Sequence, residues 1–260
     1  MKTAGLALAV ALFCAPAWAE EPAVEFEPPE LSTAVAAKYA LFAMIASNSY
    51  HKADRERFHV ELLDWMQVEA DGQAGDKPTY QGKSGLAYDI FENRKTGEYI
   101  FAFRGTDSKR DYLWANLAVP PLDIQYLSAR KRFGEFLAAH PGSKVTLTGH
   151  SLGGGLALSM SVRYGVDAVV FDSSPRIFDG LGNKHLPANR VMIYESGEIL
   201  AVVRKFWKNI LRAVPRENIY KATFDFGGVS RHRSDFLARG LLNLGAGADA
   251  SLVPVRDAPK

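Results

Sequence analysis

The side chain best placed to do chemistry is Ser151, in the segment Gly149-His150-Ser151-Leu152-Gly153. The segment fits the pattern G-x-S-x-G, in which a sharp turn between a strand and a helix lifts a serine hydroxyl off the strand end. The turn is crowded, which is why it needs the flanking glycines. Residues 145–148 form a short β-branched run before the motif, and a helix of small residues follows it. We therefore predict that Ser151 is a nucleophile and that the Leu152 N–H is an oxyanion donor.

Such a serine needs a histidine as general base and a carboxylate to orient that histidine. In folds that carry a G-x-S-x-G turn, the order along the chain is serine, acid, histidine. His150 lies inside the motif, and His185 precedes the best acid candidates, so His232 is the predicted base. An ordinary surface histidine between two arginines is the alternative for that position. The order excludes the three remaining histidines, His51, His59 and His140.

Four separated segments resemble the class 3 lipase family, the fungal-type lipases and their bacterial relatives. Residues 149–154 read as the family's GHSLGG, residues 103–106 as its FRGT and residues 174–176 as its SPR. Residues 193–200 are similar to the family's strand and the acid that follows it. The resemblance covers roughly residues 85–235 and implies the α/β-hydrolase fold.

The resemblance also implies roles for individual residues. The oxyanion hole would consist of the backbone N–H groups of Thr106 and Leu152, and the Thr106 hydroxyl would help to hold the oxyanion. His232 stands where the family carries its histidine, in a loop before the final helix. Arg104 is expected to tie loops together as a structural residue and not to act in catalysis.

Three carboxylates compete for the role of triad acid. Glu198 precedes Ile199-Leu200 and occupies the position where the family has Asp followed by two branched apolar residues. This is a departure from the family pattern, although the longer arm can still reach the histidine. Glu195, directly after the strand, and Asp172, after the preceding strand, are the alternatives.

The pattern of elements that must position these residues predicts an α/β fold with helices on both faces of a mostly parallel mixed sheet. Ser32, as N-cap, begins an expected helix that ends at Ser49. Residues 58–68 fit a strand or a helix, and residues 71–82 a loop. We expect a turn at 93–97. The expected strands are 86–91, 99–103, 144–148, 168–171, 190–194 and 219–224, and the further helices are 110–118, 125–140, 152–164, 198–211 and 234–244.

The N-terminus has the pattern of a signal peptide. Lys2 precedes a short apolar stretch, and Ala17-Trp18-Ala19 predicts cleavage after residue 19. An uncleaved N-terminal anchor is the alternative interpretation. Residues 20–30 are expected to form an extended leader, and residues 31–260 a single domain. Cys14, the only cysteine, lies in the signal segment, so no disulfide is expected in an exported, periplasmic or secreted product.

Two segments are candidates for contact with substrate or membrane. Residues 110–126 are apolar and lie where the family places its mobile lid, although a core-packed helix and loop is an equal alternative. Residues 203–214 have a basic face beside an apolar face with Trp207, which fits peripheral contact with lipid or an ordinary surface helix. The chain has 31 basic and 29 acidic residues, which gives no drive toward nucleic acid. No metal or cofactor site is predicted, and no signal for an oligomeric state is present.

These features predict an exported serine hydrolase that cleaves carboxylic esters of lipids, glycerides or phospholipids, through an acyl-enzyme. A soluble short-chain carboxylesterase is the first alternative. A catalytically inactive hydrolase fold that binds lipid or a partner is the second. A secreted toxin that acts on the membranes of rival cells would use the same chemistry.

Overall fold

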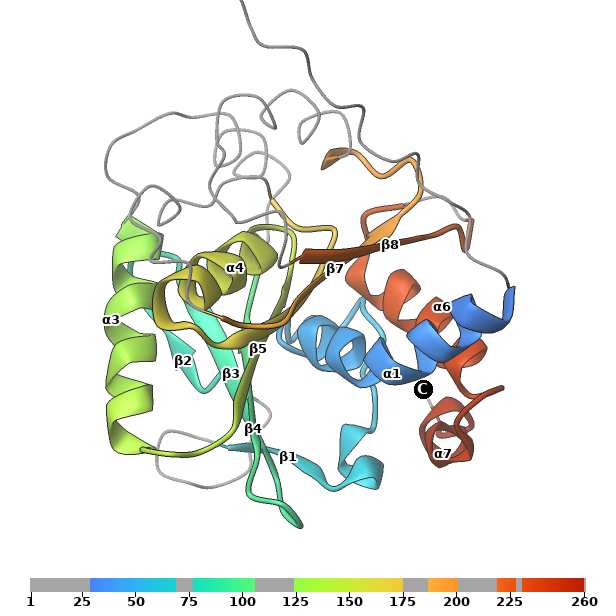
Figure 1. Ribbon diagram of the computed structural model, residues 1–260, viewed down its shortest axis with the longest axis horizontal. Coiled ribbons are helices and arrows are strands. Elements are labelled where there is room, and N and C mark those ends of the chain that lie inside the picture. Colours follow the sequence, from blue (N-terminus) through green and yellow to red (C-terminus); the bar gives the residue numbers. More distant parts are fainter. Residues whose placement is uncertain are drawn as a thin grey trace, which may run out of the picture.

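The computed structural model of the chain describes residues 29–68, 77–105, 124–174, 187–200, 219–227 and 231–259. An eight-stranded sheet forms its centre, in the order β1-β3-β4-β5-β6-β7-β8, with β2 paired to β3 (Figure 1). The strands are β1 (Trp65–Val68), β2 (Tyr80–Gln81), β3 (Ala87–Asn93), β4 (Tyr99–Phe103), β5 (Val145–His150), β6 (Asp167–Phe171), β7 (Arg190–Glu195) and β8 (Ile219–Phe224).

The sheet is mixed, as predicted. The pairs of β3 with β1, β2 and β4 are antiparallel, whereas β4 to β8 run parallel to one another. Parallel strands present their carboxyl ends at one edge, so residues that follow β5, β6 and β7 come together there. Ser151, Asp172 and Glu198 all follow these strands. The predicted α/β-hydrolase architecture is therefore confirmed, and it places the candidate residues at one edge of the sheet.

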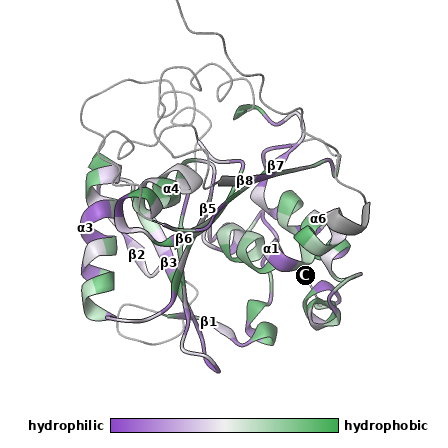
Figure 2. Ribbon diagram, in the orientation of Figure 1, coloured by the Kyte–Doolittle hydropathy of each residue, from purple (hydrophilic) through white to green (hydrophobic). Residues whose placement is uncertain are grey.

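Helices cover both faces of this sheet. Helices α1 (Pro29–Asn48) and α6 (Ser234–Gly245) pack together over one face, where Met44, Ile45 and Leu241 join the buried core. Helices α3 (Ile124–Ala139) and α4 (Leu152–Tyr164) cover the other face, around Phe101 and Phe133. Figure 2 shows the hydrophobic residues on these helices. Two short 3-10 helices, η1 (Val60–Leu63) and η4 (Ala250–Leu252), and α7 (Val253–Arg256) complete the described elements.

Most expected elements are confirmed with shifts of up to three residues at their ends. The chain turns between β3 and β4 where the turn was expected, and Gly97 has a positive φ of 70°. The ambiguous segment 58–68 contains both a 3-10 turn and strand β1.

Three local expectations are wrong. The first helix begins at Pro29, so Ser32 lies inside it and is not its N-cap; a proline suits a first turn because its missing N–H would have had no partner there. Residues 71–82 were expected to form a loop, but Tyr80–Gln81 is a short strand that pairs with the start of β3. So short a strand needs only the unpaired backbone groups of its neighbour. Glu198 is not helical, and helical backbone starts at Leu200.

Several expectations fall on residues outside the described ranges. They are the signal peptide, most of the leader, the expected helix 110–118 with the lid candidate up to residue 123, most of the expected helix 198–211, the basic helix 203–214, Thr106 and His185. Within the described ranges, the helices are too short or too polar for one of them to pass through a bilayer.

Candidate active site

Ser151 lies on the sharp turn between β5 and α4. Its backbone has φ 59° and ψ −126°, a left-handed value that is strained for any residue with a Cβ. The Ser151 N–H donates to Phe171 O at 3.0 Å, and Ser174 N–H donates to Ser151 O at 2.9 Å. The ends of β5 and β6 therefore hold the strained turn from both sides.

The glycines around the serine are required by close packing. A Cβ on Gly149 would lie 2.5 Å from Gly153 C and O, and one on Gly154 would lie 2.8 Å from Ser173 Cβ. A Cβ on Gly153 would meet the Phe103 carbonyl oxygen. Helix α4 thus starts in direct contact with the end of β4, which explains why the crowded turn has glycine at these positions.

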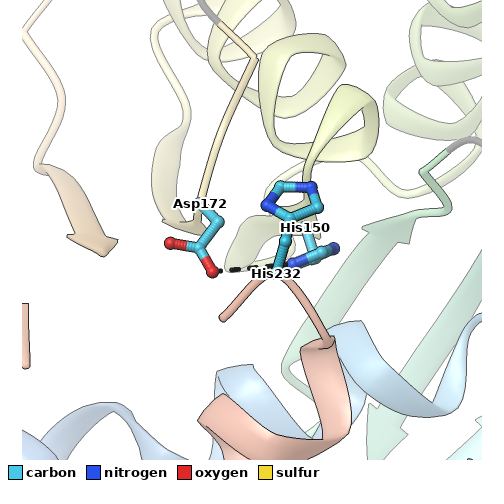
Figure 3. Close-up of side chains that lie close together, drawn as sticks. All are labelled: His150, Asp172 and His232. Carbon is cyan, nitrogen blue, oxygen red and sulfur yellow. Dashed lines mark ion pairs between the residues drawn. The ribbon is translucent and has the colours of Figure 1, made fainter. Parts of the chain in front are cut away.

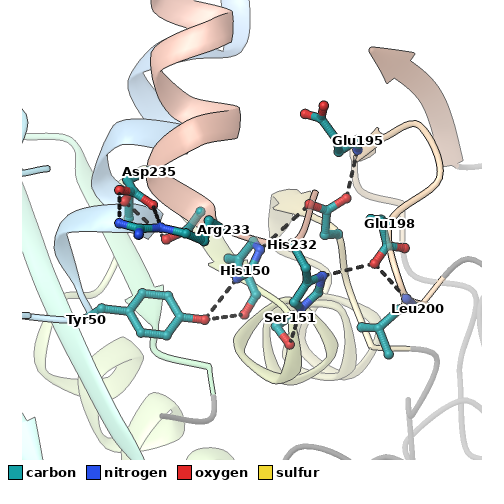
Figure 4. A network of polar contacts seen from close by, with 12 residues as sticks. Tyr50, His150, Ser151, Glu195, Glu198, Leu200, His232, Arg233 and Asp235 are labelled. Carbon is teal, nitrogen blue, oxygen red and sulfur yellow. Dashed lines mark hydrogen bonds and ion pairs between the residues drawn. The ribbon is translucent and has the colours of Figure 1, made fainter. Parts of the chain in front are cut away.

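Ser151, His232 and Glu198 form a continuous hydrogen-bonded chain (Figure 4). His232 Nε2 lies 3.0 Å from Ser151 Oγ, and His232 Nδ1 lies 2.9 Å from Glu198 Oε2. With its proton on Nδ1, the ring donates to Glu198 and can accept the Ser151 hydroxyl proton at Nε2. Ser151 and Glu198 are each 2 % exposed, so the contacts operate away from bulk water.

A glycine turn and a backbone contact hold Glu198 in place. Gly197 has φ 72°, which lets the chain reverse after β7. Glu198 Oε2 also accepts the Leu200 N–H at 2.7 Å. The carboxylate therefore caps the backbone where helical geometry begins, and this capping is the reason why Glu198 precedes the helix instead of belonging to it.

The residues on either side of His232 anchor its loop. Arg231 Nη1 donates to Ser196 O at 2.7 Å, beside the turn that carries Glu198. Arg233 Nη2 donates to Asp54 O at 2.7 Å, and Arg233 forms a two-point contact with Asp235. Both arginines are thus committed to other partners while the histidine between them faces Ser151.

The other two acid candidates have different partners. Asp172 Oδ1 accepts the Glu195 N–H at 2.8 Å, and Glu195 Oε1 accepts the Phe226 N–H at 3.0 Å. Burial raises the pKa of Glu195, while its hydrogen bond from Phe226 opposes that rise. Both carboxylates join neighbouring strand ends, whereas Glu198 hydrogen-bonds the histidine.

His150 and Tyr50 also belong to the site, although the sequence did not single them out. His150 Nδ1 lies 2.9 Å from Tyr50 Oη, and the His150 and His232 ring centres are 4.7 Å apart. Burial lowers the pKa of His150 well below its usual value, and His232 and Arg55 lower it further. His150 is therefore neutral near pH 7. Its place inside G-x-S-x-G was visible in the sequence, but its contact with Tyr50, 100 residues away, was not.

His150, Asp172 and His232 offer potential ligand atoms that all lie within 4.8 Å of one another (Figure 3). Two ligands of one zinc ion, with bonds of about 2.0–2.2 Å, lie at most about 4 Å apart. Both ring nitrogens of His232 are already hydrogen-bonded to Ser151 and Glu198. The donor set therefore fits a proton-handling network better than a metal site.

One side of the predicted oxyanion hole is described. Leu152 is the first residue of α4, where backbone N–H groups have no partner within the helix. Gly105, the last described residue of the FRGT segment, packs so tightly that a Cβ there would meet Tyr50 Oη and lie 2.6 Å from His150 O. The turn after β4 thus abuts the serine turn. Thr106 itself lies outside the described residues.

A cavity of about 890 Å³ lies elsewhere, between the end of α1 and strands β1 and β3. Neither Ser151, Glu198 nor His232 lines it. It is therefore not assigned as the substrate pocket.

The sequence of the chain is similar to one protein family and to two curated proteins. Residues 42–239 match the family described as phospholipase-like, with a Tle-like phospholipase domain. A protein of Candida glabrata named as a candidate lipase, ATG15, is 24% identical over 195 residues, which are 57% of this chain and 36% of that protein. The extracellular phospholipase A1 of Serratia liquefaciens is 38% identical over 93 residues, 35% of this chain and 28% of that protein.

The fold is similar to that of a lipase from Rhizopus microsporus var. chinensis, with a TM-score of 0.50 and 14% identity. That match covers 79% of this chain and 83% of the lipase. At this identity the likeness concerns the fold. The matches to the two curated relatives span only about a third of their lengths. The resemblance to class 3 lipases that the sequence motifs predicted is confirmed by family and by fold.

Proposed function

The chain belongs to the phospholipase-like family with a Tle-like phospholipase domain, and on that premise we propose that it is a serine hydrolase of lipid carboxylic esters. The observation that carries the proposal is the chain of contacts from Ser151 Oγ through His232 to Glu198 Oε2, with distances of 3.0 and 2.9 Å. A serine, a histidine and a buried carboxylate in this order are what acyl transfer by serine requires.

In the proposed first step, His232 Nε2 takes the proton of Ser151 Oγ while that oxygen attacks the ester carbonyl. Glu198 keeps the ring in the productive tautomer and stabilises the imidazolium. The N–H groups of Leu152 and Thr106 bind the oxyanion, and each such donor is worth about 3 kcal/mol in the transition state. His232 then protonates the leaving alcohol, which leaves an acyl group on Ser151.

In the second step, water attacks the acyl-enzyme with His232 again as the base, and the carboxylic acid leaves. Both steps need the His232 ring to stay in one orientation. Glu198 Oε2 holds it there while the Leu200 N–H fixes the same oxygen.

The proposed substrates are phospholipids or glycerides. The family description and the Serratia phospholipase A1 favour phospholipids. Export through residues 1–19, to the periplasm or the medium, remains part of the proposal, and the extracellular location of that relative is compatible with it.

The decisive experiment is labelling with a fluorophosphonate, which reacts selectively with an activated serine. Wild type should label, Ser151→Ala should not, and His232→Ala should label at least about a hundredfold more slowly, because the general base is lost. Ser143→Ala and His140→Ala, outside the hydrogen-bonded chain, are matched controls and should label like wild type. Wild type that fails to label in detergent and on liposomes would overturn the proposal in favour of an inactive lipid-binding fold.

Unlabelled wild type is then tested on a substrate panel, because the fluorophosphonate blocks the nucleophile. Release of fatty acid from phosphatidylcholine or phosphatidylethanolamine vesicles supports a phospholipase, and release from trioctanoin emulsion supports a glyceride lipase. Turnover of soluble p-nitrophenyl butyrate alone would contradict the lipid assignment and favour the short-chain carboxylesterase.

A further inference from the structure

A second buried carboxylate lies behind the pair of His232 and Ser151. Asp172 follows β6 directly and is fully buried, and its backbone φ is 41°. Its N–H donates to Ile193 O at 2.9 Å, and its Oδ1 accepts the Glu195 N–H at 2.8 Å. The side chain is therefore fixed from β7 on one side, and its other oxygen, Oδ2, is directed toward the site (Figure 3).

His150 connects that oxygen to the reacting groups. Asp172 Oδ2 lies 3.7 Å from His150 Nε2, and the side chains are 0% and 2% exposed. Tyr50 Oη lies 2.9 Å from His150 Nδ1 on the opposite side of the ring. In the tautomer in which the tyrosine hydroxyl donates to Nδ1, the His150 proton lies on Nε2, the ring nitrogen 3.7 Å from Asp172 Oδ2. The His150 ring lies beside that of His232, with ring centres 4.7 Å apart and 46° between the ring planes.

The charges in this arrangement change during the reaction. His150 is neutral, since burial lowers its pKa well below the usual range. When His232 accepts the serine proton it becomes a cation near the Asp172 side chain, because a carboxylate oxygen of Asp172 and ring nitrogens of His150 and His232 all lie within 4.8 Å of one another. Charges buried at such a distance interact strongly because little water screens them.

We propose that Asp172 is a positioning residue of the site that acts through His150, supporting the protonated form of His232 while Glu198 orients the ring. The inference rests on the proposed function for its catalytic meaning. Asp172 after β6 and Glu198 after β7 give the histidine two carboxyl neighbours that come from different strands.

Other charged and titratable groups surround the same histidine. Glu198 and Glu195 approach from β7, and Arg231 and Arg233 flank His232 in its own loop. Near the end of α1, the guanidinium of Arg55 lies 3.8 Å from the centre of the Tyr50 ring, and Asp235 holds Arg233. A useful substitution must therefore remove the charge of Asp172 and leave all of these groups in place.

Asp172→Asn does this. Asparagine tolerates a positive φ and keeps an oxygen that can accept the Glu195 N–H. Asp167→Asn is the matched control, because it removes the same charge from the opposite end of β6, where Asp167 pairs with Asn189. Asp172→Glu is the charge-preserving rescue, and Asp172→Ser is a second neutral variant with a shorter acceptor.

The readouts are the pH profile of kcat/KM for a soluble ester and an NMR titration of the His232 imidazole, assigned with His232→Ala. In Asp172→Asn, both the acid limb and the imidazole pKa should move to lower pH by about one unit, because a neighbouring negative charge is gone. The kcat should fall several-fold with KM unchanged, since a less basic imidazole is a poorer proton acceptor. Asp167→Asn should match wild type, and Asp172→Glu should recover most of the shift.

An unchanged acid limb and imidazole pKa in folded Asp172→Asn, or in Asp172→Ser should the first variant not fold, would overturn the inference. The step through His150 is tested with His150→Asn, which retains an amide for Tyr50 but lacks the ring. The Asp172→Asn shift should shrink in that background, and a shift of the same size would overturn the role of His150. The NMR titration needs no substrate, so the inference is decided even if wild type proves inactive, an outcome that would reject the proposed function alone.

Discussion

At the scale of single residues, the three carboxylates near His232 have distinct tasks that the sequence could only partly separate. Glu198 follows a glycine turn, and its Oε2 meets both the Leu200 N–H and the histidine. Asp172 and Glu195 bind backbone N–H groups of neighbouring strand ends. The deciding factor is where each side chain points after its strand, which depends on turn geometry such as the positive φ of Gly197.

Glu198→Gln should test the proposed triad acid most directly. Glutamine keeps the size of the side chain but removes the charge that favours the imidazolium and the correct tautomer. We expect kcat to fall about a thousandfold to ten-thousandfold with little change in KM. Steady-state kinetics on a soluble ester measure this effect.

Glu195→Gln is the matched control for that experiment, because it lies three residues earlier and can still accept the Phe226 N–H. It should retain wild-type kcat to within a few-fold. If Glu195→Gln instead lost more activity than Glu198→Gln, the assignment of the acid would have to be exchanged.

The site could be predicted from sequence only where a local pattern carries it. Ser151 is marked by G-x-S-x-G, and His232 follows from the order of residues along the chain. Tyr50 carries no such mark, because its contact with His150 depends on how the end of α1 packs against β5. Asp172 could be recognised in the sequence as a carboxylate after a strand. Its approach to His150 depends on its positive φ, which no sequence pattern predicts for an aspartate at this position.

At the scale of elements, the alternation of strands and helices was predictable because buried parallel strands form short apolar runs between turn residues. Strand β8 and helix α4 agree with the expected ranges, 219–224 and 152–164. The short edge strand β2 was missed, since two residues carry no periodic signal and pair only because β3 offers a free edge. The expected start of α1 was three residues too late, because Ser32 is a favourable N-cap and was chosen over Pro29, which suits the first turn of a helix.

Gly153→Ala should show that the contact between α4 and β4 is required for the site. The added Cβ would meet the Phe103 carbonyl oxygen, which is fixed in the sheet, so the helix start would have to move away. We expect a loss of at least about 2 kcal/mol in the free energy of unfolding and the loss of fluorophosphonate labelling. Urea denaturation and labelling rates measure the two effects.

Gly247→Ala, after α6, is the control for this substitution. Its Cβ would lie 3.3 Å from Leu244 O, a contact that a shift of a few tenths of an ångström relieves. It should cost less than about 1 kcal/mol and leave labelling intact. Equal effects of the two substitutions would mean that Gly153 is not specially constrained.

At the scale of the whole molecule, burial of polar groups around one sheet edge couples the site to stability. His150 is 1% exposed at this edge, and burial holds its pKa well below the usual value. Such groups keep one charge state in the folded protein, whereas the unfolded chain titrates normally. Folding stability therefore depends on pH through them.

The sign for His150 follows from its lowered pKa. Below its usual value of about 6.5, the unfolded chain takes up a proton that the folded protein refuses, so the unfolded state gains stability as pH falls. This contribution is constant above about pH 7 and is lost progressively below it. Asp89 and Glu195, whose pKa values are raised by burial, act in the opposite direction, since the folded protein there keeps a proton longer than the unfolded chain.

His150→Asn should isolate this contribution, because Asp89 and Glu195 remain in both proteins and cancel in the comparison. Wild type should lose about 1.4 kcal/mol more than the variant in the free energy of unfolding between pH 7.5 and 5.5, a window just below the usual histidine pKa. Urea denaturation at the two pH values measures the difference. His59→Asn, at the protein surface, should lose as much as wild type. An equal loss in wild type and His150→Asn would mean that His150 binds a proton in the folded protein, and it would remove the neutral ring on which the arrangement of Asp172, His150 and His232 depends.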